Sequence, residues 1–174
     1  MTWSGKPALD RPAVEIRVIG VDEWPLWRNL RLQALGEAPY AFSSTLAEWQ
    51  GKGDTETRWR DRLSTVHFNV LAYLNGKAAG MVSATAANQD GTIELISLWV
   101  APFARGHGIG DSLVAVVIEW ARRQRASKLT LAVVESNRHA DALYRRHRFV
   151  DAGAIDCTGS GIASERQMVR NLKT

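Results

Sequence analysis

The stretch "VAPFARGHGIGDSL", residues 100–113, places Gly106, Gly108 and Gly110 between an apolar run and a long amphipathic run. Glycine is costly inside helices and strands, because it loses more backbone freedom on folding than other residues. A turn that leads from a strand into a helix exposes backbone N–H groups without intrahelical partners, and the helix dipole adds positive potential there. The stretch therefore predicts either an anion-binding turn, with Arg105 as a fixed positive charge beside it, or a plain tight turn.

The spacing of these glycines argues against two common phosphate-binding motifs. Gly110 is followed by Asp111 and Ser112, whereas a P-loop has Lys and then Ser or Thr after its last glycine. A dinucleotide fingerprint has the spacing G-x-G-x-x-G and follows the first strand of its domain, whereas these glycines are two residues apart and occur late. Nucleoside triphosphate chemistry and dinucleotide binding by this loop are therefore disfavoured.

The residues on either side of the turn predict a β-α-β unit. "TIELISLWV", residues 92–100, is apolar on both faces, which is typical of a central strand in a covered sheet. After the turn, apolar residues recur at helical spacing as one stripe: Ile109, Leu113, Val116, Val117 and Trp120. "KLTLAVVES", residues 128–136, predicts a further buried strand, and the crossover between the two strands should be right-handed.

The remaining segments predict more strands and helices around this unit. "VEIRVIG", residues 14–20, predicts a strand, followed by a helix with Asp22 as N-cap. Asn75-Gly76 between two β-prone runs predicts a hairpin with a type I′ turn. Two short helices capped by Ser44 or Thr45 and by Thr55 precede the hairpin, and a helix over "NRHADALYRRH" and two closing strands end the chain.

Together these elements predict an α/β fold in one domain, with a mixed sheet of about six to seven strands and about four helices. We expect residues 1–13 to form a loose arm and residues 14–174 to form the domain. With 174 residues, 45% of them hydrophobic and 23% charged, the composition is that of a globular protein. No apolar stretch approaches the ~20 residues that cross a bilayer, so we expect no membrane partner and a cytoplasmic location.

Several ligand classes are disfavoured by the residue counts. Cys157 is the only cysteine, which excludes an intrachain disulfide and favours a buried small side chain at that position. The four histidines show no metal-ligand spacing, so no metal is expected. The net charge of +4 suits an anionic ligand, and the arginine-rich helices favour solvated faces over a nucleic-acid patch because no aromatic-interleaved basic motif accompanies them.

Two segments resemble the GNAT superfamily of acetyl-CoA-dependent N-acetyltransferases over residues 14–172. "LISLWVAPFARGHGIGDSLV" contains Arg105, Gly108 and Gly110 as R-x-x-G-x-G, and "VVESNRHADALYRRHRF" follows it at the expected distance. The resemblance implies acetyl-CoA as co-substrate, a loop that wraps its pyrophosphate and a strand end along its pantetheine arm. It implies these cofactor-binding residues: Leu98, Trp99, Val100, Arg105, Gly106, His107, Gly108, Ile109, Gly110, Asp111, Ser112 and Asn137.

Acetyl transfer needs a neutral amine, a polarised thioester carbonyl and a proton for the leaving thiolate. Glu94, in an apolar strand where a carboxylate is costly, is the candidate base, and its burial should raise its pKa. The alternative is a solvated Glu at a frayed strand start. Tyr144 would be the acid by resemblance, or else a core aromatic. A backbone N–H near Val100 is expected to meet the thioester oxygen, because the strand is interrupted before Pro102.

The family usually has Gly-Phe after the tyrosine helix, and this chain has Arg148-Phe149. That turn must therefore close without the residue that most easily adopts a left-handed conformation. The acceptor is expected to be a primary amine of a small molecule or a protein, and Trp24, Trp27 and Trp49 either pack in the core or shape its site. A non-catalytic acyl-CoA sensor is the alternative function, and a homodimer is common among relatives.

Overall fold

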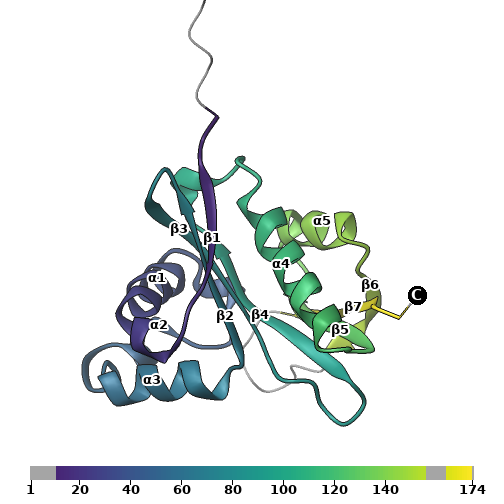
Figure 1. Cartoon of the computed structure of the whole chain (residues 1–174), viewed down its shortest axis with the longest axis horizontal. Coiled ribbons are helices and arrows are strands. Elements are labelled where there is room, and N and C mark those ends of the chain that lie inside the picture. Colours follow the sequence, from purple (N-terminus) through teal and green to yellow (C-terminus); the bar gives the residue numbers. More distant parts are fainter. Residues whose placement is uncertain (1–10, 156–163, 174) are drawn as a thin grey trace, which may run out of the picture.

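A computed structural model describes residues 11–155 and 164–173 of the chain. Its centre is a sheet with the strand order β1-β2-β3-β4-β5-β7-β6 (Figure 1). The strands are β1 (Val14–Val18), β2 (Phe68–Leu74), β3 (Lys77–Ala84), β4 (Thr92–Val100), β5 (Lys128–Val134), β6 (Val150–Ile155) and β7 (Glu165–Asn171). The helices are α1 (Trp24–Glu37), α2 (Leu46–Trp49), α3 (Glu56–Thr65), α4 (Ile109–Arg123) and α5 (Arg138–Arg146).

The predicted α/β architecture is confirmed. Within the described residues the sheet has seven strands, and only the β4–β5 pair is parallel. Four helices exceed one turn, and α2 is a single turn of four residues. Residues 1–10 of the expected arm, and Cys157, lie outside the described residues.

Local sequence signals explain most element boundaries. Asn75 and Gly76 have φ of 49° and 78°, the two left-handed residues that a type I′ hairpin turn requires. The Thr45 and Thr55 side chains accept hydrogen bonds from backbone N–H groups in the first turns of α2 and α3, so both predicted caps are confirmed. The expected cap at Asp22 is wrong: a 3-10 turn precedes α1, and the Asp22 carboxylate instead pairs with Arg60 at 2.7 Å.

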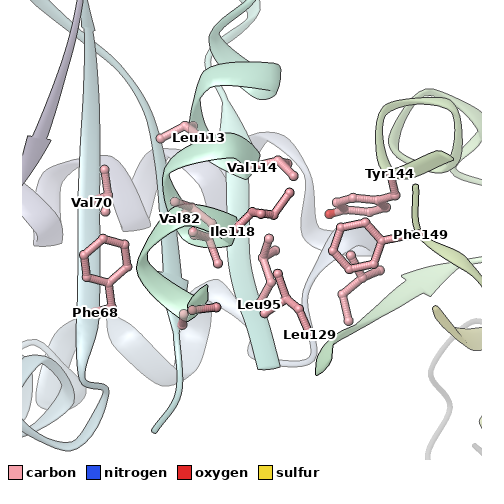
Figure 2. Packing of buried hydrophobic residues seen from close by; sticks show 14 of the residues in the cluster. Phe68, Val70, Val82, Leu95, Leu113, Val114, Ile118, Leu129, Tyr144 and Phe149 are labelled. Atoms are coloured by element: carbon pink, nitrogen blue, oxygen red, sulfur yellow. The ribbon is translucent and has the colours of Figure 1, made fainter. Parts of the chain in front are cut away.

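Two hydrophobic cores lie on opposite faces of the sheet (Figure 1). On one face, α4 and the end of α5 pack against the middle strands, and Figure 2 shows Leu113, Val114 and Ile118 of α4 above Leu95 and Leu129. On the other face, α1 and α3 contribute buried side chains that include two tryptophans, Trp27 and Trp59. The sheet is therefore covered on both sides, which explains why β4 is apolar on both faces.

The end of α5 closes through a left-handed residue that is not glycine. Arg148 has φ of +62°, and the Phe149 N–H donates to the Tyr144 carbonyl at 3.1 Å. Phe149 is thereby buried in the core beside Tyr144, with their ring centroids 5.9 Å apart (Figure 2). A left-handed conformation costs a residue with a Cβ about 1 kcal/mol, so this turn is held by the burial of the phenylalanine that follows it.

We expect Arg148→Gly to raise the free energy of unfolding by about 0.5 kcal/mol. Relief of the left-handed strain, about 1 kcal/mol, outweighs the larger backbone entropy of glycine in the unfolded chain. Urea denaturation measures the change. Ala142→Gly, at an exposed position within α5, is the control and should destabilise by about 1 kcal/mol. Equal losses in the two variants would contradict this account of the turn.

Candidate active site

A cleft opens where β4 and β5 part in the middle of the sheet. The parallel pairing between these strands extends only from Thr92 to Glu94 on β4. After Glu94, β4 has a bulge in its pairing with its other neighbour, β3. At this bulge Ser97 and Leu98 of β4 lie opposite a single residue of β3. Ser97 has φ of +59°, the left-handed conformation of a bulge. A bulge bends its strand and increases the local twist, so it accounts for the parting of the two strands.

The cleft has a volume of about 760 Å³ and runs from β4 and β5 to the start of α4. Its walls come from β4, β5, α5 and the turn before α4. Most of the predicted cofactor-binding residues line it: Leu98, Trp99, Val100, Arg105, Gly106, Gly108, Ile109, Gly110, Asp111 and Asn137. Two of the predicted residues, His107 and Ser112, are not among the residues that line it.

The turn at the mouth of the cleft presents a row of free backbone donors. Within the described part of the chain, the N–H groups from Gly106 through Asp111 donate to no protein acceptor, whereas the next one, Ser112 N–H, donates to Gly108 at 3.0 Å. Gly106 and Gly108 have φ of +81° and +75°, and a Cβ on either would meet nothing within 4 Å. Such a row at a helix N-terminus, where the helix dipole is positive, has the donors and the potential that suit an anion.

A glycine is needed at position 110 for a different reason, which is the packing of α4 against α5. Gly110 lies in the first turn of α4, where a Cβ would approach the Leu143 side chain of α5 to 3.2 Å. The absence of a side chain at Gly110 therefore lets α4 and α5 pack closely. Of the three glycines, only Gly106 and Gly108 supply the left-handed turn itself.

The side chain of Arg105 is held by protein groups. Its Nη2 lies 2.9 Å from Oε2 of Glu37, and its Nε donates to the Val100 carbonyl at 3.1 Å. Trp99 Nε1 donates to the same Glu37 oxygen at 2.9 Å. The hydrogen bond from Trp99, reinforced by Arg105, holds the pKa of Glu37 below its ordinary value. Glu37 thus ties the end of α1 to the end of β4, and no feature of the sequence indicated this role.

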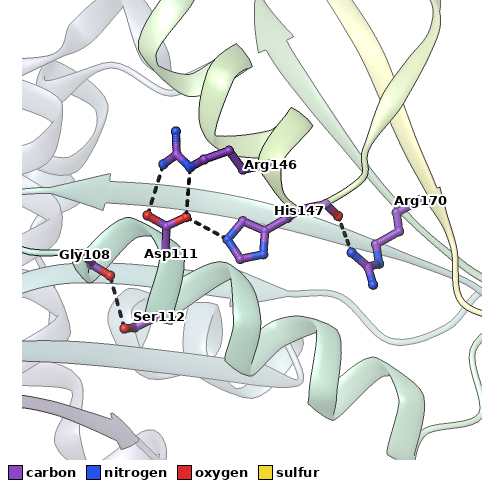
Figure 3. A network of polar contacts seen from close by, with 6 residues as sticks. All are labelled: Gly108, Asp111, Ser112, Arg146, His147 and Arg170. Carbon is purple, nitrogen blue, oxygen red and sulfur yellow. Dashed lines mark hydrogen bonds and ion pairs between the residues drawn. The ribbon is translucent and has the colours of Figure 1, made fainter.

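Asp111 joins the start of α4 to the end of α5 (Figure 3). Its carboxylate pairs with Arg146 at 3.0 Å and with Nε2 of His147 at 2.9 Å, so it connects α4 to the end of α5. The hydrogen bond from Arg146 is the main reason why the pKa of Asp111 lies below its ordinary value. Ser112 is also used within the helix, because its hydroxyl donates to the Gly108 carbonyl at 3.1 Å. The sequence did not single out Arg146 or His147 as partners.

A smaller pocket of about 430 Å³ adjoins the cleft. Both are lined by Ala41, Leu98, Ala132, Tyr144 and Glu165, so these side chains form the shared wall. The polar groups that belong to the smaller pocket alone are Arg31, Ser43, Ser44, Arg62, Glu94 and Ser97. The two candidate catalytic residues, Glu94 of β4 and Tyr144 of α5, therefore both line this pocket.

Glu94 and Tyr144 occupy contrasting environments. The Glu94 residue is exposed, so it does not have the burial that its apolar neighbours predicted, but partial desolvation still raises the pKa of its carboxyl. Tyr144 is 6% exposed, and its burial raises the pKa of the hydroxyl well above the ordinary value. The tyrosine hydroxyl therefore remains protonated and neutral at physiological pH.

Asn137 is the N-cap of α5, and its Oδ1 accepts the Ala140 N–H at 3.2 Å. Its side-chain carbonyl is therefore used within the helix, while the residue lines the cleft. Trp24, Trp27 and Trp49 line neither pocket. Trp27 is fully buried in the core, and Trp49 packs on Trp59 with ring centroids 4.5 Å apart.

Within residues 11–155 and 164–173, no three His, Cys, Asp or Glu side chains lie close enough to hold a metal ion together. Among the helices that the structure describes, none has both the length and the apolar character needed to cross a membrane.

The chain belongs to the GNAT acetyltransferase family, because the model of that family matches residues 27–149, well over half of its length. A streptothricin acetyltransferase from Streptomyces lavendulae is 41% identical over 93 residues, which cover 52% of this chain and 48% of that protein. N-acetylaspartate synthetase from Rattus norvegicus is 34% identical over 86 residues, which cover 49% of this chain and 29% of that protein. The chain thus matches half or less of each of these relatives.

The fold of the family is also found among solved structures. The structure of yncA from Salmonella typhimurium, solved with its cofactor acetyl-CoA, superposes with a TM-score of 0.69 and 19% identity. The superposition covers 92% of this chain and 95% of that one. It confirms the GNAT-like fold that the sequence predicted.

Proposed function

We propose that the protein is an N-acetyltransferase, which moves an acetyl group from acetyl-CoA to a primary amine by direct attack in a ternary complex. The observation that carries this proposal is the row of free N–H groups from Gly106 through Asp111 at the mouth of the cleft. A row of donors at a helix N-terminus suits a pyrophosphate, which can accept several hydrogen bonds at once. Membership of the family and the acetyl-CoA complex of yncA support the same co-substrate.

The pantetheine arm would lie along the free edge of β4. Ala101 N–H donates to Ala79 of β3 at 2.8 Å, and Trp99 pairs with Met81. Because N–H groups alternate in direction along a strand, the N–H of Val100 points to the opposite edge, into the gap between β4 and β5. This donor is our candidate for the group that polarises the thioester carbonyl. Arg105, already paired with Glu37, would act on the cofactor mainly by fixing the loop.

Glu94 would accept a proton from the attacking amine, and Tyr144 would donate a proton to the leaving thiolate. The amine nitrogen forms a bond to the acetyl carbon, and the bond from that carbon to sulfur breaks. The proton of the amine passes to Glu94, directly or through water, and the Tyr144 hydroxyl gives a proton to the departing thiolate. The raised pKa of Glu94 suits a base, and Tyr144 lines both the cleft and the smaller pocket.

The acceptor is not fixed by the family. One relative is named for streptothricin and another for N-acetylaspartate. We propose a small-molecule or protein amine that enters the smaller pocket, and a cytoplasmic location, since a chain with a single cysteine needs no oxidising compartment. A non-catalytic acyl-CoA sensor would have the same cleft, and it would bind the cofactor without turnover.

We expect Gly108→Ala to weaken binding of coenzyme A about tenfold, which corresponds to about 1.4 kcal/mol. The methyl group would enter the open space above the free N–H row and strain a residue with φ of +75°. Isothermal titration calorimetry with coenzyme A measures the change. Gly51→Ala is the matched control, because Gly51 also has a positive φ, of +58°, and open space around it but lies away from the cleft. Equal affinities in both variants would contradict the assignment of the loop.

We expect the purified protein to release free thiol from acetyl-CoA in the presence of at least one class of amine among polyamines, aminoglycosides, amino acids and peptides. Tyr144→Phe should lower kcat about 100-fold, because loss of a general acid slows departure of the thiolate, and should leave the affinity for acetyl-CoA unchanged. Tyr73→Phe, on β2 and outside both pockets, is the control. Unchanged turnover in Tyr144→Phe would remove the tyrosine from the mechanism, and binding without any turnover would favour the sensor.

We expect kcat/KM of the wild-type protein to fall on the acidic side, as Glu94 becomes protonated. Because partial desolvation raises the pKa of Glu94, this limb should lie above the pH of about 4.3 at which an ordinary glutamate titrates. In Glu94→Gln the rate should fall and the limb should disappear, whereas Glu15→Gln, on the edge strand β1, should retain it. A full pH–rate profile makes the comparison. An unchanged acidic limb in Glu94→Gln would assign the base to another group.

A further inference from the structure

The smaller pocket is lined by two arginines that have no acidic partner among the described residues. Arg31 comes from α1 and Arg62 from α3, and both face the pocket that also contains Glu94. Arg31 is 7% exposed, and its Nη1 has no hydrogen-bond partner in the described structure. Its guanidinium lies over the ring of Phe42, 4.5 Å from the centroid. An aromatic face gives this cation only a weak partner.

Arg62 donates hydrogen bonds only to neutral oxygens, and its guanidinium lies 5.2 Å from the ring centroid of Trp27. It reaches Asn69 Oδ1 at 3.3 Å, Ser83 Oγ at 3.4 Å and Ser97 Oγ at 3.3 Å, all long distances for hydrogen bonds. Ser97 is the left-handed bulge residue of β4, so Arg62 contacts the same irregularity that opens the cleft.

The two guanidinium groups also repel each other. Burial, and then the charge of Arg62, lower the pKa of Arg31 to about 10. Burial alone lowers the pKa of Arg62 to about 10. In the part of the chain that the structure describes, no carboxylate lies within 4.0 Å of either group. Glu94 lines the same pocket, but the raised pKa of its carboxyl reflects desolvation without a cationic partner.

Several other partly buried arginines of this chain are paired with acids, whereas Arg58 and Arg170 donate to backbone carbonyls. Arg28, one turn before Arg31 on α1, pairs with Asp54, and Arg166 pairs with Asp141. Burying an unpaired charge is costly, and two adjacent like charges add to that cost. A bound anion would remove it, because guanidinium groups match carboxylate and phosphate oxygens in geometry.

We propose that the acceptor is a small amine that also carries an anionic oxygen group, a carboxylate or a phosphate, and that Arg31 and Arg62 bind this group. The inference rests on the proposed acetyltransferase function. A pocket of about 430 Å³ has room for a molecule of amino-acid size. With its anionic end on the two arginines, such a molecule directs its amine toward Glu94 and Tyr144, at the wall shared with the cleft.

The first test compares acceptors that differ only in charge. Thiol release from acetyl-CoA is measured with phenylalanine and phenylalaninamide, with leucine and leucinamide, and with phosphoethanolamine and ethanolamine, and spermidine serves as a cationic amine. At least one anionic member should have a kcat/KM ten or more times that of its neutral partner. A preference for the acids alone assigns a carboxylate, and a preference for phosphoethanolamine alone assigns a phosphate. Equal rates within every pair, or turnover of spermidine alone, would overturn the proposal.

The second test removes the arginines one at a time. Arg31→Met and Arg62→Met should raise the KM of the preferred anionic acceptor at least tenfold and abolish its advantage, while the KM of acetyl-CoA stays unchanged. Arg60→Gln, on the outer face of α3, where Arg60 pairs with Asp22 and Glu56, is the matched control and should keep both KM values. Arg31→Met should keep or raise the melting temperature, because it removes an unpaired buried charge. An unchanged KM for the anionic acceptor in folded variants would contradict the assignment.

A binding measurement separates failure of this inference from failure of the proposed function. If no amine is acetylated, the acetyltransferase proposal fails. Calorimetry then compares N-acetylphenylalanine with its amide, and N-acetylphosphoethanolamine with N-acetylethanolamine, using wild-type protein saturated with coenzyme A. Binding of an anionic compound at least tenfold tighter than its neutral partner, lost in Arg31→Met and kept in Arg60→Gln, would support the anion site. Equal binding, or no binding by either anionic compound, would overturn it.

Discussion

The parting of β4 and β5 is the constraint on which the rest of this molecule depends. Strands in the middle of a sheet normally pair along their whole length, because each unpaired N–H or C=O group that is shielded from water costs free energy. Here the pairing ends at Glu94, and the bulge at Ser97 bends β4 away from its neighbour. The gap leaves a sheet edge inside the molecule, and the cleft, the smaller pocket and the start of α4 are all arranged around it. One of the two cores spans the gap, because it contains buried residues of β4 on one side and of β5 and β7 on the other.

Patterns that act over a few residues were predictable from the sequence. The hairpin at Asn75-Gly76, the caps at Thr45 and Thr55 and the left-handed strain at Arg148 each follow from one or two residue types at a turn. The glycine turn before α4 was likewise predictable, although Gly110, the third glycine, lets α4 and α5 pack closely and does not form the turn. The expected cap at Asp22 was wrong because a 3-10 turn and an ion pair to Arg60, which is distant in sequence, compete for that position.

Features that depend on long-range contacts were not predictable. The bulge falls on a serine within an apolar run, where nothing marks a left-handed residue. The ion-pair partners of Arg105 and Asp111 come from other helices. The exposure of Glu94 depends on β5, whose pairing with β4 ends at that residue. One signal was available and was missed: Arg31 lies four residues after Trp27, on the buried stripe of α1, where an arginine is unexpected without a partner.

The unpaired edge of β4 also links ligand binding to the stability of the fold. A ligand that pairs with the donors of β4 and of the turn from Gly106 to Asp111 binds only the native chain, since these donors are aligned only there. By mass action such a ligand stabilises the fold, by about 2.7 kcal/mol at a hundred times its dissociation constant. Folded domains in general have net stabilities of about 5–15 kcal/mol, so this is a substantial share. The abundance of the protein in a cell would then follow the supply of that ligand.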